Sequence, residues 1–405
     1  MAWYGLDLSM AALLSATHPW PEKNTPPSNN EVQITCESGA AIFQTKIYLP
    51  TESLMFSMKS TFALIFTFLM LVGCSASQPE YADVGEVYRI SPEFDQLISP
   101  NTYAKKLAER FEWAEGPVWI ERKDAKGLIF TDIPRNRVVL WLEHEDPVTL
   151  IHPAGYTGNT NRGGEMGANG LAFDANQNLI LCQHGDRRLA MLKREDQVSG
   201  YRKIKFETLV DNYNGKKFNS PNDLIIKSNG DIYFTDPPYG LEGYTSDPKR
   251  ELDFQGVYRL TKDKKLTLLT KELTRPNGIA FSPDEKTLYV SNSDSLRAIW
   301  MAYPVNPDGT IGKGKVFYDA TAMVKEGKQG LPDGMKVDQK GNIWATGPGG
   351  VLVFSPAGKL LGVINVGKVV ANVAFGNDGS VLYMTANDTL CRIKTNARGL
   401  KFKAN

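Results

Sequence analysis

The hydrophobic pattern from Phe111 onward predicts a repeated β-sheet unit. Apolar and polar residues alternate in short runs, and Asn-Gly-type turns separate the runs, as in Ser228-Asn229-Gly230-Asp231 and Gln339-Lys340-Gly341-Asn342. Helical periodicity is nearly absent from this region. Ahead of it, we expect one short helix around Tyr103 to Arg110.

One polar residue recurs at the start of each unit. The six positions are Glu115, Asn169, Asn222, Asn277, Asp333 and Asn372, which lie 54, 53, 55, 56 and 39 residues apart. Each interval suits one four-stranded blade, so the sequence predicts an all-β, six-bladed β-propeller over residues 111–405. The alternatives are a seven-bladed ring that recruits residues 80–112 and a less regular β-barrel.

The N-terminal part predicts export. Residues 58–74 have a basic start, an apolar stretch too short to span a bilayer and small residues at the end, which is typical of a signal peptide. Leu71-Val72-Gly73-Cys74 resembles a bacterial lipoprotein cleavage box. By that resemblance, Ser75 after the cysteine favours transport of the lipoprotein to the outer membrane over retention in the inner membrane. We therefore expect an envelope or periplasmic lipoprotein that meets the membrane only through a lipid on Cys74. Residues 75–110 then form a tether and closing segment.

Residues 1–57 precede this signal and are rich in Pro and Asn between Pro19 and Asn30. Because signal peptides begin chains, we expect Met58 to be the true start. The alternative is an internal hydrophobic anchor with residues 1–57 as a real domain.

The composition of the chain limits the classes of ligand that it is expected to bind. The chain has 46 basic and 45 acidic residues, so its formal charge of +1 does not favour nucleic acid, and we expect a small, weakly charged ligand. Four cysteines without a CxxC pair argue against zinc and a disulfide framework. We expect Cys182 and Cys391 to be buried free thiols.

The first strand of each propeller blade lines the channel, so the six recurring residues are expected to converge there. All six side chains carry oxygen, which favours a hard cation: Ca²⁺ first, with Mg²⁺ or Mn²⁺ as alternatives. A single Asn or Asp before Gly is an ordinary turn residue, but six in register indicate a site. The expected metal ligands are Glu115, Asn222, Asn277 and Asp333, while Asn169 and Asn372 complete the lining.

Four stretches carry a family resemblance. Those stretches are Glu115-Gly116-Pro117, Ser220-Pro221-Asn222-Asp223, Arg275-Pro276-Asn277-Gly278 and Pro332-Asp333-Gly334-Met335. Together they resemble the signatures of the gluconolactonase, regucalcin and diisopropyl-fluorophosphatase family over roughly residues 111–395. The resemblance assigns the family's metal-binding Glu, Asn, Asn and Asp to the four expected ligands.

Two further stretches look closest to the bacterial gluconolactonase-like branch; they run from Gln183 to Arg188 and from Phe234 to Gly240. One departure bears on sugar-lactone selectivity. This chain has Ser220 where the animal lactonases of the family have an arginine.

The resemblance implies a divalent-metal-dependent hydrolase that opens sugar lactones by metal-activated water. Asp333 is the candidate that accepts the water's proton, Asp223 is the reserve, and Glu115 balances charge. The candidate substrate contacts are Asn169, His184, Arg187, Ser220, Asp223 and Tyr239. Each of four residues also has a plainer interpretation. His184 would only make a hydrogen bond at a strand end, and Arg187 would lie on the solvated surface. Asp223 would orient its own loop, and Tyr239 would pack in the core or a turn.

Other functions stay open. A non-catalytic metal- or ligand-binding envelope propeller would use the same ring, and a related esterase would act on other substrates, including phosphotriesters. A strictosidine-synthase-like propeller would use a channel glutamate and needs fewer metal-type ligands than this ring offers. No nucleophilic triad is visible, because the chain has only four histidines.

Overall fold

The computed structural model describes residues 31–38, 41–48, 81–121, 126–160, 163–193 and 204–400. The chain forms two compact units, Met1–Ser77 and Gln78–Asn405. In the first unit, β1 (Glu31–Ser38) and β2 (Ala41–Tyr48) form an antiparallel hairpin. The predicted signal segment 58–74 and Cys74 lie outside the described residues.

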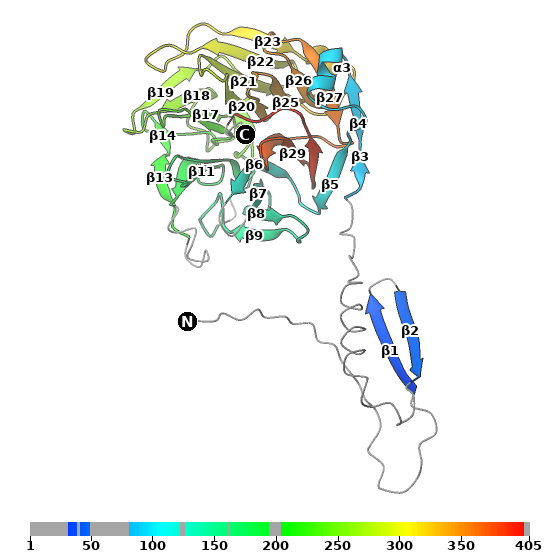
Figure 1. Ribbon diagram of the computed structural model, residues 1–405. Helices are drawn as coiled ribbons and strands as arrows, with labels where there is room; N and C mark the ends of the chain where they lie inside the picture. Colours follow the sequence, from blue (N-terminus) through cyan, green and yellow to red (C-terminus); the bar gives the residue numbers. More distant parts are fainter. Residues whose placement is uncertain are drawn as a thin grey trace, which may run out of the picture. The chain divides into compact units, whose positions relative to one another are not determined.

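The second unit is a six-bladed propeller whose blades are antiparallel sheets arranged around a centre (Figure 1). The first blade contains β6 (Ala114–Glu121), β7 (Lys126–Asp132), β8 (Arg137–Leu142) and β9 (Val148–Ile151). The second contains β10 (Ala168–Phe173), β11 (Leu179–Gln183), β12 (Arg188–Leu192) and β13 (Glu207–Val210). The third contains β16 (Leu224–Ile226), β17 (Ile232–Asp236), β18 (Gly256–Leu260) and β19 (Leu266–Thr270).

The remaining blades follow the same order. The fourth contains β20 (Pro276–Phe281), β21 (Thr287–Asp294), β22 (Arg297–Pro304) and β23 (Lys315–Asp319). The fifth contains β24 (Met335–Val337), β25 (Ile343–Gly347), β26 (Gly350–Phe354), β27 (Leu360–Asn365) and β4 (Glu86–Arg89). The sixth contains β28 (Asn372–Gly376), β29 (Val381–Ala386), β30 (Thr389–Lys394), β5 (Ala104–Glu109) and β3 (Asp83–Val84).

Short elements connect these sheets. They are the 3-10 turns η1 (Pro92–Gln96) and η2 (Tyr244–Ser246), the helix α3 (Thr321–Lys325) and the hairpin β14 (Asn212–Tyr213) with β15 (Lys216–Lys217). Within the described ranges, α3 is the only α-helix, as the lack of helical periodicity predicted.

The first strands of the blades close a ring. Contacts run from β6 to β10, β16, β20, β24 and β28 and return to β6. The six-bladed prediction is therefore confirmed. The seven-bladed alternative is wrong, because residues 83–109 supply strands to the fifth and sixth blades instead of a blade of their own.

The short helix expected around Tyr103 to Arg110 is also wrong. This segment forms β5, which pairs with β30 in the register Leu390↔Ala108 and Arg392↔Lys105. Without β5, the outer edge of β30 would expose a row of unpaired backbone N–H and C=O groups. The strand thus closes the ring with a segment from the opposite end of the propeller sequence.

Each pair of neighbouring blades shares a hydrophobic cluster. One cluster joins the sixth and first blades through Tyr383 and Phe130, and another joins the fourth and fifth through Trp300 and Phe354. Cys182 and Cys391 are buried free thiols within such clusters, as expected. The inner strands are therefore held in place by packing on both faces.

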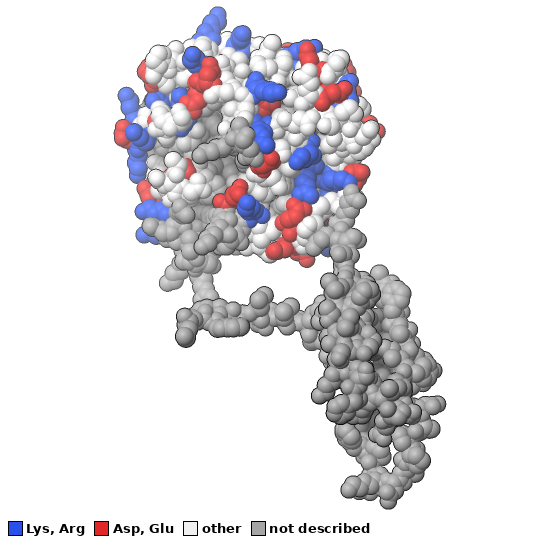
Figure 2. All heavy atoms as spheres, in the orientation of Figure 1, with Lys and Arg blue, Asp and Glu red and all other residues white. Residues whose placement is uncertain are grey.

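The surface has no strong bias of charge on the face drawn in Figure 2, where basic and acidic side chains are interspersed over the propeller. None of the helices in the described part of the chain has the length and apolar character needed to cross a bilayer.

Candidate metal centre and active site

The six recurring residues, one at the start of each blade, are called the channel ring below: Glu115, Asn169, Asn222, Asn277, Asp333 and Asn372. Hydroxyl groups on the second strands of the blades hold this ring in place. In four blades, a Thr or Ser hydroxyl donates a hydrogen bond to the backbone carbonyl of the ring residue of the next blade or of the residue directly before it. The pairs are Thr131 with Asn169 (3.1 Å), Thr235 with Asn277 (2.7 Å), Ser291 with Asp333 (2.9 Å) and Thr346 with Ala371 (2.9 Å). These four blades thereby position the ring residues of their neighbours.

The residue after Thr235 fixes the approach to the ring in its own blade. The carboxylate of Asp236 accepts backbone N–H groups from Asn219 (2.9 Å) and Ser220 (2.7 Å), just ahead of Asn222. Asp132 does the same for Glu112 and Trp113 ahead of Glu115. Despite these donors, burial raises the pKa of Asp236 to about 7.

Glycine after the ring residue lets adjacent inner strands approach closely. A Cβ on Gly116 would lie 2.1 Å from the carbonyl oxygen of Asn169, and one on Gly278 would lie 2.2 Å from that of Asp333. Gly116 also has a φ of +54°, which disfavours other residues. Glycine at these two positions therefore allows the neighbouring inner strands to pack closely.

The six recurring residues come together in the channel as the sequence predicted. Glu115, Asn169, Asn222, Asn277 and Asn372 are buried, and Asp333 is half-buried. Within the described part of the chain, four buried oxygens at or beside the ring have no hydrogen-bond partner: Oδ1 of Asn169, Asn222 and Asp333, and Oδ2 of Asp223. Buried unpartnered oxygens are costly. This donor set fits a hard divalent cation.

Asn amides are essential to such a site. No group of three or more His, Cys, Asp or Glu side chains in the described ranges is arranged to hold a metal ion. A cation at the ring would therefore need the oxygens of Asn222 and Asn277 beside the carboxylates of Glu115 and Asp333.

The carboxylates of the ring share a strongly perturbed environment. Burial and the nearby charge of Asp223 raise the pKa of Glu115 to about 7. Burial, and then the charges of Glu115 and Asp223, raise the pKa of Asp333 well above its usual value. Burial also raises the pKa of Asp223. A positive charge at the ring would offset this repulsion.

Lys336 is a ring residue that the sequence interpretation missed. Its Nζ donates to the carbonyl oxygen of Met335 (3.1 Å) and to Oδ1 of Asn372 (3.5 Å). Its charge acts to lower the pKa of both Glu115 and Asp223. The available signal was its place directly after Pro332-Asp333-Gly334-Met335, three residues beyond an expected ligand.

His184 and Tyr239 lie near the ring with a second missed residue, Glu165. His184 is buried, and its Nδ1 lies 3.0 Å from Oε2 of Glu165. Burial raises the pKa of Tyr239, and the charges of Asp333 and Glu165 raise it further. The Tyr239 hydroxyl donates to the carbonyl oxygen of Ser293 at 3.5 Å. Glu165 lies in the long loop between β9 and β10, where no repeat pattern marks it.

Ser220 holds the loop that carries Tyr239 through hydrogen bonds. Its hydroxyl donates to the carbonyl oxygen of Pro237 (2.6 Å) and accepts the N–H of Gly240 (2.8 Å). A Cβ on Gly240 would lie 2.6 Å from the Cβ of Ser220 and 2.9 Å from that of His184. The loop therefore fills the space that a long side chain at position 220 would need.

Arg187 is engaged by the protein itself. Its guanidinium donates to the carbonyl oxygens of Phe218 (2.6 Å), Lys249 (2.9 Å) and Lys217 (3.5 Å). Burial lowers the pKa of Arg187, and its ion pair with Glu251 opposes that effect. This geometry favours a structural role over the substrate contact that the sequence suggests.

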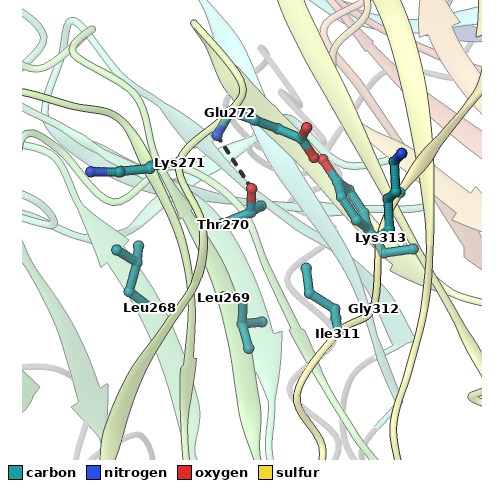
Figure 3. A pocket seen from close by; sticks show the side chains of 10 residues that line it. Leu268, Leu269, Thr270, Lys271, Glu272, Ile311, Gly312 and Lys313 are labelled. Carbon is teal, nitrogen blue, oxygen red and sulfur yellow. Dashed lines mark hydrogen bonds between the residues drawn. The ribbon is translucent and has the colours of Figure 1, made fainter.

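A separate surface hollow lies away from the ring. Its volume is about 450 Å³, and Figure 3 labels two of the segments that line it, Leu268 to Glu272 and Ile311 to Lys313. In this view the backbone N–H of Glu272 donates to the Thr270 hydroxyl at 3.2 Å. No ring residue lines this hollow, so the candidate site is the channel.

A model of the family described as SMP-30/Gluconolactonase/LRE-like region matches residues 113–388, which span all six ring positions. The chain belongs to this family. A gluconolactonase of Zymomonas mobilis is 35% identical over 327 residues, covering 78% of this chain and 88% of the relative. The pentonolactonase XacC of Haloferax volcanii is 27% identical over 277 residues, covering 67% of this chain and 80% of the relative.

Solved structures agree with the fold of this family member. A gluconolactonase from Xanthomonas campestris superposes with a TM-score of 0.66 at 29% identity, covering 79% of this chain and 99% of that one. A calcium-binding regucalcin from Agrobacterium tumefaciens gives a TM-score of 0.54 at 20% identity over 74% of this chain and 95% of that one, which supports the fold alone.

Proposed function

We propose that this protein hydrolyses sugar lactones with the help of one divalent cation, Ca²⁺ before Mg²⁺ or Mn²⁺. The observation that carries the proposal is the set of buried, unpartnered oxygens on the ring of a gluconolactonase-family propeller. The ligands in this proposal are Glu115, Asn222, Asn277 and Asp333. The similarity to a gluconolactonase and a pentonolactonase supports a lactone as the substrate.

A bound divalent cation supplies Lewis-acid polarisation of the lactone carbonyl and a lower pKa for water. The carboxylates of the chain take the remaining roles in the proposed reaction. Asp333 is half-buried at the channel and accepts the proton of the attacking water. Glu115, fixed by the Asn372 amide, keeps the ring negative. Asp223 is the reserve base, since its Oδ2 has no partner in the described ranges.

The residues near the ring then orient the sugar. Tyr239 presents a phenol close to Asp333, and the His184–Glu165 pair presents a polar edge beside it. Asn169 offers an unpartnered amide oxygen from the second blade. Ser220 acts indirectly, because its hydroxyl holds the loop of Tyr239. This arrangement replaces the arginine of the animal lactonases with a clamped loop.

The test is hydrolysis of glucono-δ-lactone by the chain from Ser75 onward, which contains the whole second unit. The protein is assayed with chelator and after return of Ca²⁺, Mg²⁺, Mn²⁺ or Zn²⁺. We expect activity to vanish with chelator, return with a hard cation and fall at least about 100-fold in Asp333→Ala. Asp308→Asn, on an exposed turn, is the matched control and keeps full activity.

Three outcomes would contradict the proposal. Metal binding without turnover across a panel of lactones would favour the ligand-binding propeller. Turnover of phosphotriesters with no turnover of lactones would favour the esterase alternative. Equal activity in chelated and metal-loaded protein would remove the cation from the reaction.

We further propose export and lipid attachment at Cys74, on the basis of residues 58–74 and Ser75. Mass spectrometry of the mature protein checks this. An N-terminal diacylated Cys74 is expected, and membrane release is expected for Cys74→Ser. A mature chain that begins elsewhere, or an unmodified Cys74, would contradict it.

A further inference from the structure

The third blade departs from the pattern that follows the ring residues. Four blades place glycine there, and the sixth places Val373; these glycines are Gly116, Gly170, Gly278 and Gly334. The third blade has Asp223 instead, and this residue is only 4% exposed. The Leu224 N–H donates to Oδ1 of Asp223 at 2.8 Å, while Oδ2 has no partner in the described part of the chain. The ring thus carries a third carboxylate.

Lys336 supplies a cation to the same ring from the fifth blade. Its Nζ reaches Oδ1 of Asn372 in the sixth blade at 3.5 Å. Its charge also acts on Glu115 in the first blade and on Asp223 in the third. The contact with Asn372, whose amide also donates to Oε2 of Glu115 at 3.0 Å, places this ammonium at the ring.

The charges of this arrangement balance. Glu115, Asp223 and Asp333 contribute three negative charges if all are ionised, and Lys336 with one divalent cation contributes three positive charges. Removing either Lys336 or Asp223 would leave a buried charge uncompensated, which is costly at low dielectric.

We propose that Lys336 is the built-in counter-cation of the carboxylates of this ring, and that its charge and that of Asp223 together set the affinity of the ring for a divalent cation. The inference rests on the proposed metal site and does not require that the metal be catalytic. Lys336 repels the incoming dication, whereas Asp223 attracts it. The two residues are positioning residues, because they act through the charge of the ring.

The experiment is a double-mutant cycle on the full chain, with calcium chloride alone titrated calorimetrically into metal-free protein. Lys336→Met is expected to bind Ca²⁺ at least about tenfold more tightly, and Asp223→Asn at least about tenfold more weakly. The double variant is expected to return close to wild type. Lys336→Arg keeps the charge and is expected to keep wild-type affinity within about threefold. Lys336→Gln repeats the test if the Met variant does not fold.

Thermal unfolding with and without Ca²⁺ gives a second readout that is independent of activity. The calcium-induced rise in the unfolding midpoint is expected to follow the affinities, largest for Lys336→Met and smallest for Asp223→Asn. Unchanged or weaker binding in Lys336→Met would overturn the inference, as would a double variant that binds Ca²⁺ as weakly as Asp223→Asn alone. If the wild-type chain binds no divalent cation, both the metal site and this inference fail. If it binds but shows no turnover, only the proposed function fails.

Discussion

Asn372 donates a hydrogen bond from Nδ2 to Oε2 of Glu115 over 3.0 Å, joining the sixth blade to the first. Its Oδ1 accepts the N–H of Val373 at 2.9 Å and the ammonium of Lys336 at 3.5 Å. The amide is therefore fixed in one orientation and fixes the carboxylate in turn. Partners of this kind commonly tune metal ligands in proteins.

Asn372→Ala should weaken metal binding through Glu115. Loss of the amide leaves Oε2 of Glu115 without its side-chain donor, so we expect about 10-fold weaker Ca²⁺ binding and about 1–2 kcal/mol less unfolding free energy. Asn377→Ala is the matched control, because Asn377 accepts the Tyr383 hydroxyl at 2.6 Å in the same blade, away from the ring. Calorimetry and denaturant unfolding measure both effects. Equal loss of Ca²⁺ affinity in the two variants would contradict the role of Asn372.

Thr235→Val should loosen the ring at Asn277. The Thr235 hydroxyl donates to the Asn277 carbonyl at 2.7 Å and accepts the Asp223 N–H at 3.2 Å, and valine has the same shape without these bonds. Leaving these buried groups unpaired should cost about 1–3 kcal/mol of unfolding free energy. Thr267→Val, in the outer strand β19, should cost less than about 0.5 kcal/mol. Chemical denaturation distinguishes the two, and similar costs would argue against the hydroxyl contacts.

The ring positions were predictable because one polar side chain recurs in a strongly periodic unit. The spacing alone located Glu115 and Asp333, more than two hundred residues apart, at one site. Strand β5 was not predictable, since Ala104 to Glu109 reads Ala-Lys-Lys-Leu-Ala-Glu, all good helix formers. Pairing with the open edge of β30 overrides that local preference.

The missed site residues have a similar explanation. Glu165 lies in a loop outside the repeat, so no register assigns it to the site. Lys336 is within the repeat, but a lysine in a strand is usually an exposed residue. Only the closure of the ring brings its ammonium near carboxylates of other blades. A local sequence pattern does not show which residues of distant blades meet when the propeller closes.

Asp236 should make the stability of the metal-free protein depend on pH. Burial raises the pKa of Asp236 to about 7 in the folded state, from an ordinary value of 3.8. A carboxyl with a raised folded pKa favours the folded state below its unfolded pKa, and this contribution is lost as pH rises towards 7. The slope from this group is up to about 1.4 kcal/mol per pH unit.

We therefore expect the unfolding free energy of chelated protein to fall between about pH 4 and 7, and the fall to be shallower in Asp236→Asn. Denaturant unfolding at each pH in the presence of chelator measures this slope. Asp378→Asn, whose carboxyl is exposed, is the control and should keep the wild-type slope. An identical slope in Asp236→Asn and wild type would show that Asp236 does not titrate in this range.

The segment ahead of the repeats should be part of the stable fold and not merely a tether. Phe94 in η1 is fully buried in the cluster between the fifth and sixth blades, and its ring packs on Gly362, where a Cβ would lie 2.6 Å from it. Phe94→Ala should cost about 3–5 kcal/mol of unfolding free energy because it leaves a cavity. Tyr88→Ala, at an exposed position on β4, should cost less than about 1 kcal/mol. Thermal or denaturant unfolding compares them, and a small loss in Phe94→Ala would mean that residues 81–99 fold against the propeller without stabilising it.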